Sequence, residues 1–293
     1  MANDVTSPLF YDALPMATSK VDASQRRIVY YARVGELRLP EGDNRANRIL
    51  EASGFTQKKM WSLWSRLIDA TNPQSVLDIG ANYGEMTLPL PLVKQTRVDL
   101  FEPNPSLVEV LRAAALSHPS KDKFFIHEMA VSNKSGSVVM NVDLKWSGTS
   151  AIDFKSPDSP FKGKGAQDYS EISVATTALD DHLMTLPSYL HEGIFALKID
   201  VEGHEVSVLR GAKKFLEKNF FMISEYSERQ LKFAGTDLES YVSLLCSAGW
   251  VFEISDRRFK TILSASDLSS RHGDVFVTNI AWVADMVKDK LVD

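Results

Sequence analysis

Cysteine is nearly absent from this sequence, which has one, Cys246, among 293 residues. A single cysteine cannot close an internal disulfide, so a disulfide scaffold of the secreted kind is excluded. An apolar run of the roughly 18 to 20 residues that a membrane-spanning helix needs is also missing. The first thirty residues lack the apolar core behind a basic start that a signal peptide has. We therefore expect a cytoplasmic protein with no membrane span.

The sequence also lacks an excess of positive charge. Its 33 Lys and Arg are outnumbered by 38 Asp and Glu, which gives a net charge of −5. Proteins that hold nucleic acid or anionic membranes through bulk charge are basic, so we predict no nucleic-acid partner. No repeat of fixed period and no sustained heptads occur, which argues against solenoids and coiled coils. The oligomeric state stays open.

Segments with strand and helix spacing alternate along most of the chain. Short apolar strands are predicted at residues 75–80, 97–101, 124–130, 195–201 and 220–225, with helices from Glu85 and over 106–117, 205–218 and 237–248. This alternation is typical of an α/β protein with a mainly parallel sheet and helices on both faces. Two last strands, 251–258 and 274–283, favour an antiparallel hairpin at one edge of the sheet. We count seven strands.

Two regions stand apart from this alternation. Residues 44–70 carry helical spacing behind a polar, loose arm over residues 1 to about 25. We therefore predict an N-terminal arm and helical extension over 1–70 and the main domain over 71–293. Residues 138–143 and 171–181 have strand character and flank a polar, aperiodic stretch at 145–165. This stretch is a candidate loop or lid.

A glycine-containing turn, DIGANYG at 78–84, follows the first strand of the alternation. Gly80 and Gly84 let the backbone turn tightly and approach a ligand, and Asp78 can accept hydrogen bonds. The third glycine of the dinucleotide pattern GxGxxG is missing. Glu102 ends the next strand, where an acid can accept both ribose hydroxyls of an adenosine-containing ligand. The structural alternatives are a plain turn and a Glu102 that only favours the start of the following helix.

The segment LKIDVEGHE at 197–205 places polar side chains at the end of a central strand. Lys198 and Asp200 alternate to the same face of that strand. We predict that Asp200 orients the acceptor or cofactor, with His204 or Glu225 as candidate base. Alternatively, Asp200 and Glu202 cap the next helix and His204 is a packing residue. Several carboxylates could also hold a divalent cation, but spacing does not establish that they converge, and no metal ligand is predicted.

With these motifs in this order, the sequence resembles the FkbM family of S-adenosylmethionine-dependent methyltransferases. The resemblance covers about residues 70–280, and nothing in the first 45 residues or so contributes to it. It implies a class I, Rossmann-like methyltransferase fold, with a seven-stranded sheet of order 3-2-1-4-5-7-6 in which only strand seven is antiparallel. It is carried by DIGANYG, FEPNP at 101–105, AVS at 130–132, TTALDDHL at 176–183, LKIDVEGHE and VLRGA at 208–212.

The same resemblance implies S-adenosylmethionine as cofactor and assigns residues to it. Glu102 would hold the ribose, with Pro103 beside it, and Met129 and Ala130 would lie at the adenine edge. The methionine portion and sulfonium would be surrounded by Asp78, Gly80, Ala81, Asn82 and Gly84.

The resemblance further implies the class of acceptor. The family is associated with O-methylation of sugars and secondary metabolites, so a hydroxyl of a small molecule or carbohydrate is expected. Two other functions remain open. One is a nicotinamide-dependent oxidoreductase, which the missing glycine disfavours. The other is a catalytically silent cofactor-binding module.

Overall fold

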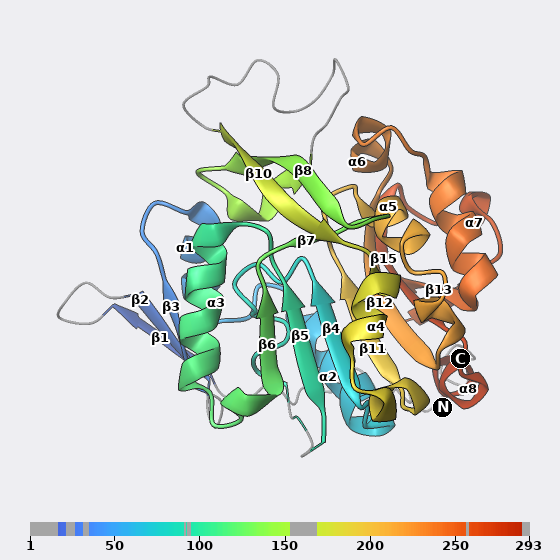
Figure 1. The fold of residues 1–293 in the computed structure, drawn as a ribbon, viewed down its shortest axis with the longest axis horizontal. Helices are drawn as coiled ribbons and strands as arrows, with labels where there is room; N and C mark the ends of the chain where they lie inside the picture. The colour runs from blue at the N-terminus through green and yellow to red at the C-terminus, as the bar shows by residue number, and fades with distance from the viewer. Residues whose placement is uncertain are drawn as a thin grey trace, which may run out of the picture.

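The computed structural model describes residues 17–21, 27–31, 35–90, 92, 95–152, 169–255 and 258–288. Its centre is an eight-stranded sheet with the order β14-β13-β15-β12-β11-β4-β5-β6 (Figure 1). The strands are β4 (Ser75–Ile79), β5 (Arg97–Phe101), β6 (Phe124–His127), β11 (Phe195–Ile199), β12 (Phe220–Ser227), β13 (Trp250–Ser255), β14 (Arg258–Ile262) and β15 (His272–Thr278).

The sheet is mixed, with five neighbouring parallel strands. Strands β6, β5, β4, β11 and β12 pair in parallel, whereas β15 lies antiparallel to both β12 and β13. The predicted count of seven strands is one too few, because β14 extends the edge as a hairpin partner of β13. In β14, Arg258 and Lys260 are exposed, whereas Phe259 and Ile262 are buried in different hydrophobic clusters, so both faces of this edge strand contribute to the core.

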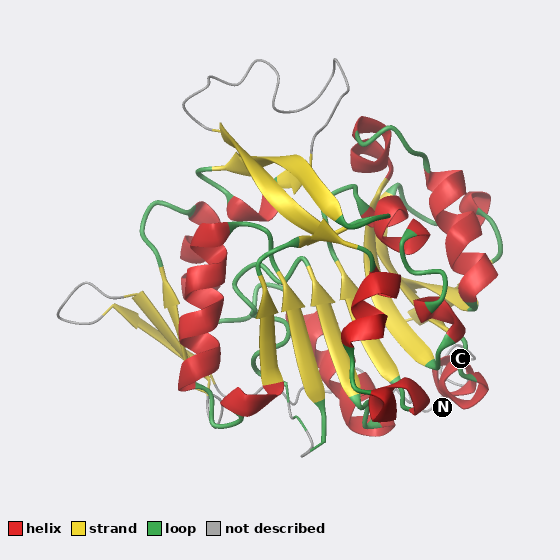
Figure 2. Cartoon of the chain, in the orientation of Figure 1, coloured by secondary structure: helices red, strands yellow, loops and turns green. Residues whose placement is uncertain are grey.

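Helices cover both faces of the sheet (Figure 2). Successive residues of β4 point to opposite faces, as strand geometry requires. Val76 joins one hydrophobic cluster with α2 (Lys58–Thr71), and Leu77 joins another with α4 (Leu179–Thr185). The other helices beside the sheet are α3 (Pro105–Ser117), α5 (Glu205–Arg210), α6 (Glu228–Phe233), α7 (Leu238–Ala248) and α8 (Ala281–Lys288).

A second, four-stranded sheet lies above the carboxyl ends of β4, β5 and β6 (Figure 1). Its strands are β7 (Ala130–Val131), β8 (Gly136–Asp143), β9 (Ala151–Ile152) and β10 (Tyr169–Thr177), in the order β7-β10-β8-β9. The strand predicted over 124–130 is therefore two strands, since β6 ends at His127 and β7 pairs with β10. Most of the predicted lid, residues 153–165, lies outside the described residues.

The N-terminal region contains strands as well as helices. β1 (Ala17–Val21), β2 (Arg27–Tyr31) and β3 (Gly35–Leu39) form an antiparallel sheet, followed by α1 (Asn44–Glu51) and α2. The prediction of a loose arm to about residue 25 is thus wrong for Ala17–Val21. Val29 and Leu37 share a hydrophobic cluster with Leu107 and Leu111 of α3, so this region packs against the sheet domain.

Three predicted elements have different limits in the structure. Residues 85–90 form turns instead of a helix, because proline at 89 and 91 removes backbone donors and disfavours helix. Helix α5 ends at Arg210, not at 218, with Gly211 as its C-cap residue. The predicted last strand ends at Thr278, and α8 follows. None of the described helices has the length and apolar character of a bilayer span.

Candidate active site

A cleft at the carboxyl edge of the sheet brings together the ends of four neighbouring strands. Gly80 follows β4, Glu102 follows β5, Asp200 follows β11, and Glu225 lies in β12. Parallel neighbours end at the same edge, which is where open α/β sheets bind ligands. Six of the residues predicted to bind cofactor line this cleft, namely Gly80, Asn82, Glu102, Pro103, Met129 and Ala130.

The loop after β4 crosses closely over the end of β11. Gly80 has a φ of +82°, and a Cβ there would overlap the carbonyl oxygen of Asp200. Asn82 also has a positive φ, +49°, and its backbone N–H donates to Glu102 Oε2 at 2.9 Å. The predicted residues Ala81 and Gly84 do not line the cleft, and both are buried.

Replacing Gly80 by alanine is expected to lower the free energy of unfolding by about 3 kcal/mol. Alanine is strained at this positive φ, and its Cβ would also collide with the carbonyl oxygen of Asp200. The matched control is Gly235→Ala. Gly235 has a φ of +74° with no heavy atom within 4 Å of an added Cβ, so only the strain of about 1 kcal/mol applies. Urea denaturation of both variants checks this difference. Equal losses would show that the loop does not need its close approach to β11.

Glu102 is 4% exposed and holds two backbone donors at once. Oε2 accepts from Asn82 and Oε1 accepts from Asn104 N at 2.9 Å. Burial raises the pKa of Glu102 to about 7, although these two hydrogen bonds favour the ionised form. Each carboxylate oxygen keeps a further lone pair, so the group can still accept hydroxyl donors from the cleft.

Asp78 does not line the cleft, in contrast to most of the residues predicted with it. Its side chain is fully buried, Oδ2 accepts from Thr87 Oγ1 at 2.6 Å, and Oδ1 lies 3.3 Å from Lys198 Nζ. Burial raises the pKa of Asp78 despite that cation. Lys198 Nζ also lies 3.4 Å from Gly80 O and from Asp200 Oδ2. Asp78 therefore acts in this structure through Lys198, which ties the loop to the end of β11.

Three carboxylates converge in the cleft near Gly80. Oxygens of Asp200, Glu202 and Glu225 lie within 4.8 Å of one another. Glu202 has a positive φ, +53°, and its Oε2 accepts a hydrogen bond from Gln230 Nε2, so a strained backbone places it there. The arrangement favours a positively charged group, whether the cation is organic or a metal ion.

Asp200 and Glu225 share one proton at neutral pH. The charge of Asp200, followed by burial, raises the pKa of Glu225 to about 11. Burial opposes ionisation of Asp200, but the charge of Lys198 and a hydrogen bond from Glu225 outweigh it and lower the pKa of Asp200. Two such close carboxyl groups cannot both ionise easily. Asp200 is therefore the ionised member and Glu225 the protonated one.

His204 is directed away from the cleft. Its Nε2 lies 2.9 Å from Ser132 Oγ, and burial lowers the pKa of His204 to about 4. The prediction of His204 as a base at the reacting atoms does not fit this position. Glu205, which sequence spacing favours as helix surface, is 2% exposed and accepts from the backbone N–H groups of Val201 and Gly203 at 3.2 Å. It is Glu205, not Asp200 or Glu202, that caps this turn.

Arg45 of α1 and Gln57 line the cleft from the N-terminal region and were not identified from the sequence. The segment from Trp146 to Ile152, which begins the stretch predicted as a lid, lines it from the second sheet. Asp43 joins these parts, since it accepts from Ser147 N at 3.2 Å and from Tyr83 Oη at 2.6 Å. Tyr83 is thereby buried and does not present an aromatic face to an acceptor. These contacts join segments up to 104 positions apart, which no local pattern reveals.

Comparison with known proteins places this cleft in a family context. Residues 78–252 match the family model described as the methyltransferase FkbM domain. The 2-O-methyltransferase NoeI of Sinorhizobium fredii (strain NBRC 101917 / NGR234) is 29% identical over 183 residues, which cover 59% of this chain and 71% of that protein.

Two solved structures are among those similar to this chain. The methyltransferase FkbM from Methylobacillus flagellatus KT has 15% sequence identity and a TM-score of 0.41, with 82% of this chain and 56% of that chain covered. This chain thus spans just over half of that protein. The O-methyltransferase from Bacillus cereus in complex with SAH has 10% sequence identity and a TM-score of 0.42, with 82% of this chain and 84% of that chain covered.

Proposed function

Because the chain belongs to the family of proteins with a methyltransferase FkbM domain, we propose that it is an S-adenosylmethionine-dependent O-methyltransferase. Its acceptor is a hydroxyl of a small molecule or carbohydrate. The proposal rests on one observation. A single cleft is lined by Glu102, Asp200, Glu225 and the turn that contains Gly80. The family match lends no support to a nicotinamide-dependent oxidoreductase or to a silent binding module.

The side chains of the cleft suit the two ends of S-adenosylmethionine. Glu102 would bind the ribose hydroxyls, and Phe101, Met129 and Ala130, which line the same cleft, would contact the adenine. At the sulfonium end of the cofactor, the ionised carboxylate of Asp200, with the carboxyl oxygens of Glu202 and Glu225 beside it, would favour a cation over a neutral ligand. When bound, S-adenosylmethionine supplies a methyl group on a positively charged sulfur.

The acceptor hydroxyl needs a group that orients it and takes its proton as the new C–O bond forms. Asp200 is the ionised acid of the cleft, so it accepts the hydrogen bond of the hydroxyl and then its proton. Glu225 is protonated at neutral pH and donates to Asp200, which makes it a positioning residue and not the base. The segment containing Trp146 covers the cleft and limits the access of water.

Two arguments support oxygen as the methylated atom, one from the chemistry of the cleft and one from a relative. A carboxylate base suits a hydroxyl, whose proton must leave during transfer. The relative NoeI is named a 2-O-methyltransferase, which agrees with this assignment. The aromatic ring of Trp146 suits the apolar face of a sugar or a flat metabolite.

The test is transfer of a labelled methyl group from S-adenosylmethionine to a panel of hydroxylated saccharides and metabolites. We expect labelled product with at least one hydroxylated acceptor, and no label when that hydroxyl is replaced by hydrogen. Label on the deoxy analogue would contradict O-methylation. Absence of transfer to every acceptor, with the cofactor bound, would contradict the proposed acceptor class.

A further inference from the structure

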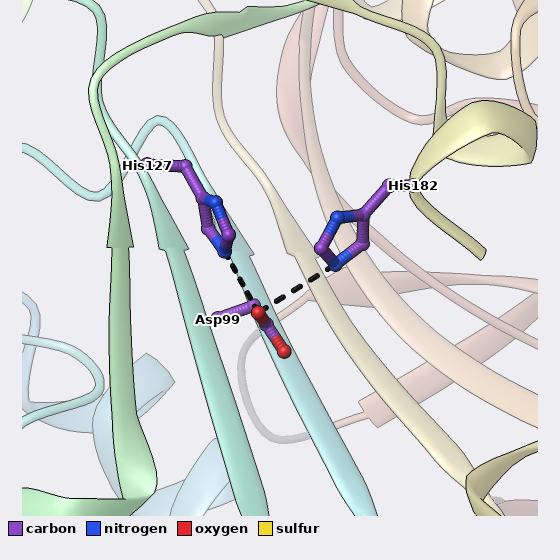
Figure 3. Close-up of side chains that lie close together, drawn as sticks. All are labelled: Asp99, His127 and His182. Carbon is purple, nitrogen blue, oxygen red and sulfur yellow. Dashed lines mark hydrogen bonds and ion pairs between the residues drawn. The ribbon is translucent and has the colours of Figure 1, made fainter. Parts of the chain in front are cut away.

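A second cluster of chemically active side chains lies on the opposite face of the sheet from Lys198. Asp99 lies in β5, His127 ends β6, and His182 lies in α4. Figure 3 shows both imidazole rings directing a nitrogen at the Asp99 carboxylate from two different elements. The three ligand atoms lie within 4.8 Å of one another, and nothing in the proposed methyl transfer uses them.

The distances in this cluster approach those of a metal site. Asp99 Oδ1 is 2.8 Å from His127 Nε2 and 3.6 Å from His182 Nε2. Ligands held 2.0–2.1 Å from a tetrahedral zinc ion lie roughly 3.3 Å apart. The two distances from Asp99 Oδ1 differ from this spacing by about 0.5 and 0.3 Å, so small movements of the two imidazole rings would bring both distances to that of a zinc site, with water as the fourth ligand.

The strongest indication of a missing ligand is His182 itself. The residue is 6% exposed, and its Nε2 is buried without a hydrogen-bond partner in the part of the chain that the structure describes. A buried polar atom without a partner is costly, and a bound ion would satisfy it. In the tautomer that carries its proton on Nδ1, Nε2 offers the lone pair that a metal binds.

Arg97 sets the expected strength of binding. Its Nε donates to Asp99 Oδ2 at 2.7 Å and its terminal nitrogen to Oδ1 at 2.8 Å, which fixes the orientation of the carboxylate. The same positive charge repels a second cation. We therefore expect a dissociation constant of micromolar order, far weaker than in the structural zinc sites of small metal-dependent domains.

From this geometry we propose that Asp99, His127 and His182 form a binding site for a divalent cation of the zinc class, distinct from the methyl-transfer cleft. The ion would join α4 to β5 and β6. Phe101 connects the two places, because its ring stacks on His127 with centroids 4.5 Å apart and also lines the cleft. Zinc, with its preference for imidazole, is favoured over magnesium.

The experiment titrates the full chain, stripped by a chelator, with Zn²⁺ in a calorimeter and with Co²⁺ followed by visible absorption. We expect one equivalent per chain, a cobalt spectrum of nitrogen and oxygen ligands, and a rise in melting temperature with zinc. His182→Ala and the more conservative His182→Gln should weaken binding at least tenfold. The control His272→Ala removes an exposed histidine and should leave it unchanged.

A further variant, Glu225→Gln, separates this site from the acidic cluster in the cleft. Zinc affinity that survives Glu225→Gln and falls in His182→Gln supports the proposal. Absence of stoichiometric binding by the folded wild-type chain would overturn it. So would zinc binding that depends on Glu225 and not on His182, and none of these results depends on methyl transfer.

Discussion

Replacing Asp200 by alanine is expected to lower kcat for methyl transfer by at least roughly 1,000-fold, within the range that a positioned general base contributes. Asp200 is the ionised carboxylate of the cleft, held by Lys198 and hydrogen-bonded to Glu225. Its removal takes away both the orientation of the acceptor hydroxyl and the proton acceptor. The measurement is the steady-state rate with labelled S-adenosylmethionine and a saturating acceptor.

Two companion variants sharpen this result. Asp200→Asn keeps an oxygen that accepts hydrogen bonds but cannot take a proton. If Asp200 is the base, kcat should fall as far as in Asp200→Ala. If Asp200 only orients the acceptor, kcat should fall less. Glu239→Ala removes an exposed carboxylate of α7 and should leave the rate unchanged. Affinity for S-adenosylhomocysteine should stay within tenfold in the Asp200 variants. A kcat within tenfold of the wild type would remove Asp200 from the mechanism.

Glu102→Ala is expected to weaken binding of S-adenosylhomocysteine by about 4 kcal/mol, roughly 1,000-fold, because hydrogen bonds to charged groups contribute about 1.5–3 kcal/mol each. The variant loses the acceptor of the ribose hydroxyls. It also releases the backbone N–H of Asn82, so the loop itself loses a support. Calorimetric titration with S-adenosylhomocysteine gives the affinity directly.

The control for Glu102 is Glu109→Ala, which removes an exposed carboxylate of α3. Its affinity should match the wild type. Circular dichroism and thermal melting of Glu102→Ala separate a lost contact from a lost fold. A folded Glu102→Ala variant with wild-type affinity would mean that the acid only holds the loop and the start of α3.

The parts of the fold that follow from local pattern were predictable. The buried run at Val76–Leu77 and the alternation of strands with helices indicate the parallel centre of the sheet, because these signals lie within short windows. The strand ends then place Gly80, Glu102 and Asp200 at one edge. For the same reason the cleft could be assembled, in outline, from three sequence motifs.

What was missed depends on contacts between distant segments. β1 is a short, mostly polar strand that is held by pairing with β2, so its sequence resembles a loose arm. The direction of His204 is set by Ser132, 72 positions away, and not by its own helix. Likewise Arg45 reaches the cleft because α1 is fixed through Asp43. The cluster of Asp99 and its two histidines combines three elements.

The most direct test of the account is calorimetric titration of the purified wild-type chain with S-adenosylhomocysteine, with NAD(H) titrated in parallel. Occupancy of the cleft between Glu102 and Asp200 predicts binding of one equivalent with a dissociation constant in the micromolar range and no heat with NAD(H). A folded chain that binds NAD(H) instead, or that binds neither ligand, would contradict the assignment of this cleft to methyl transfer.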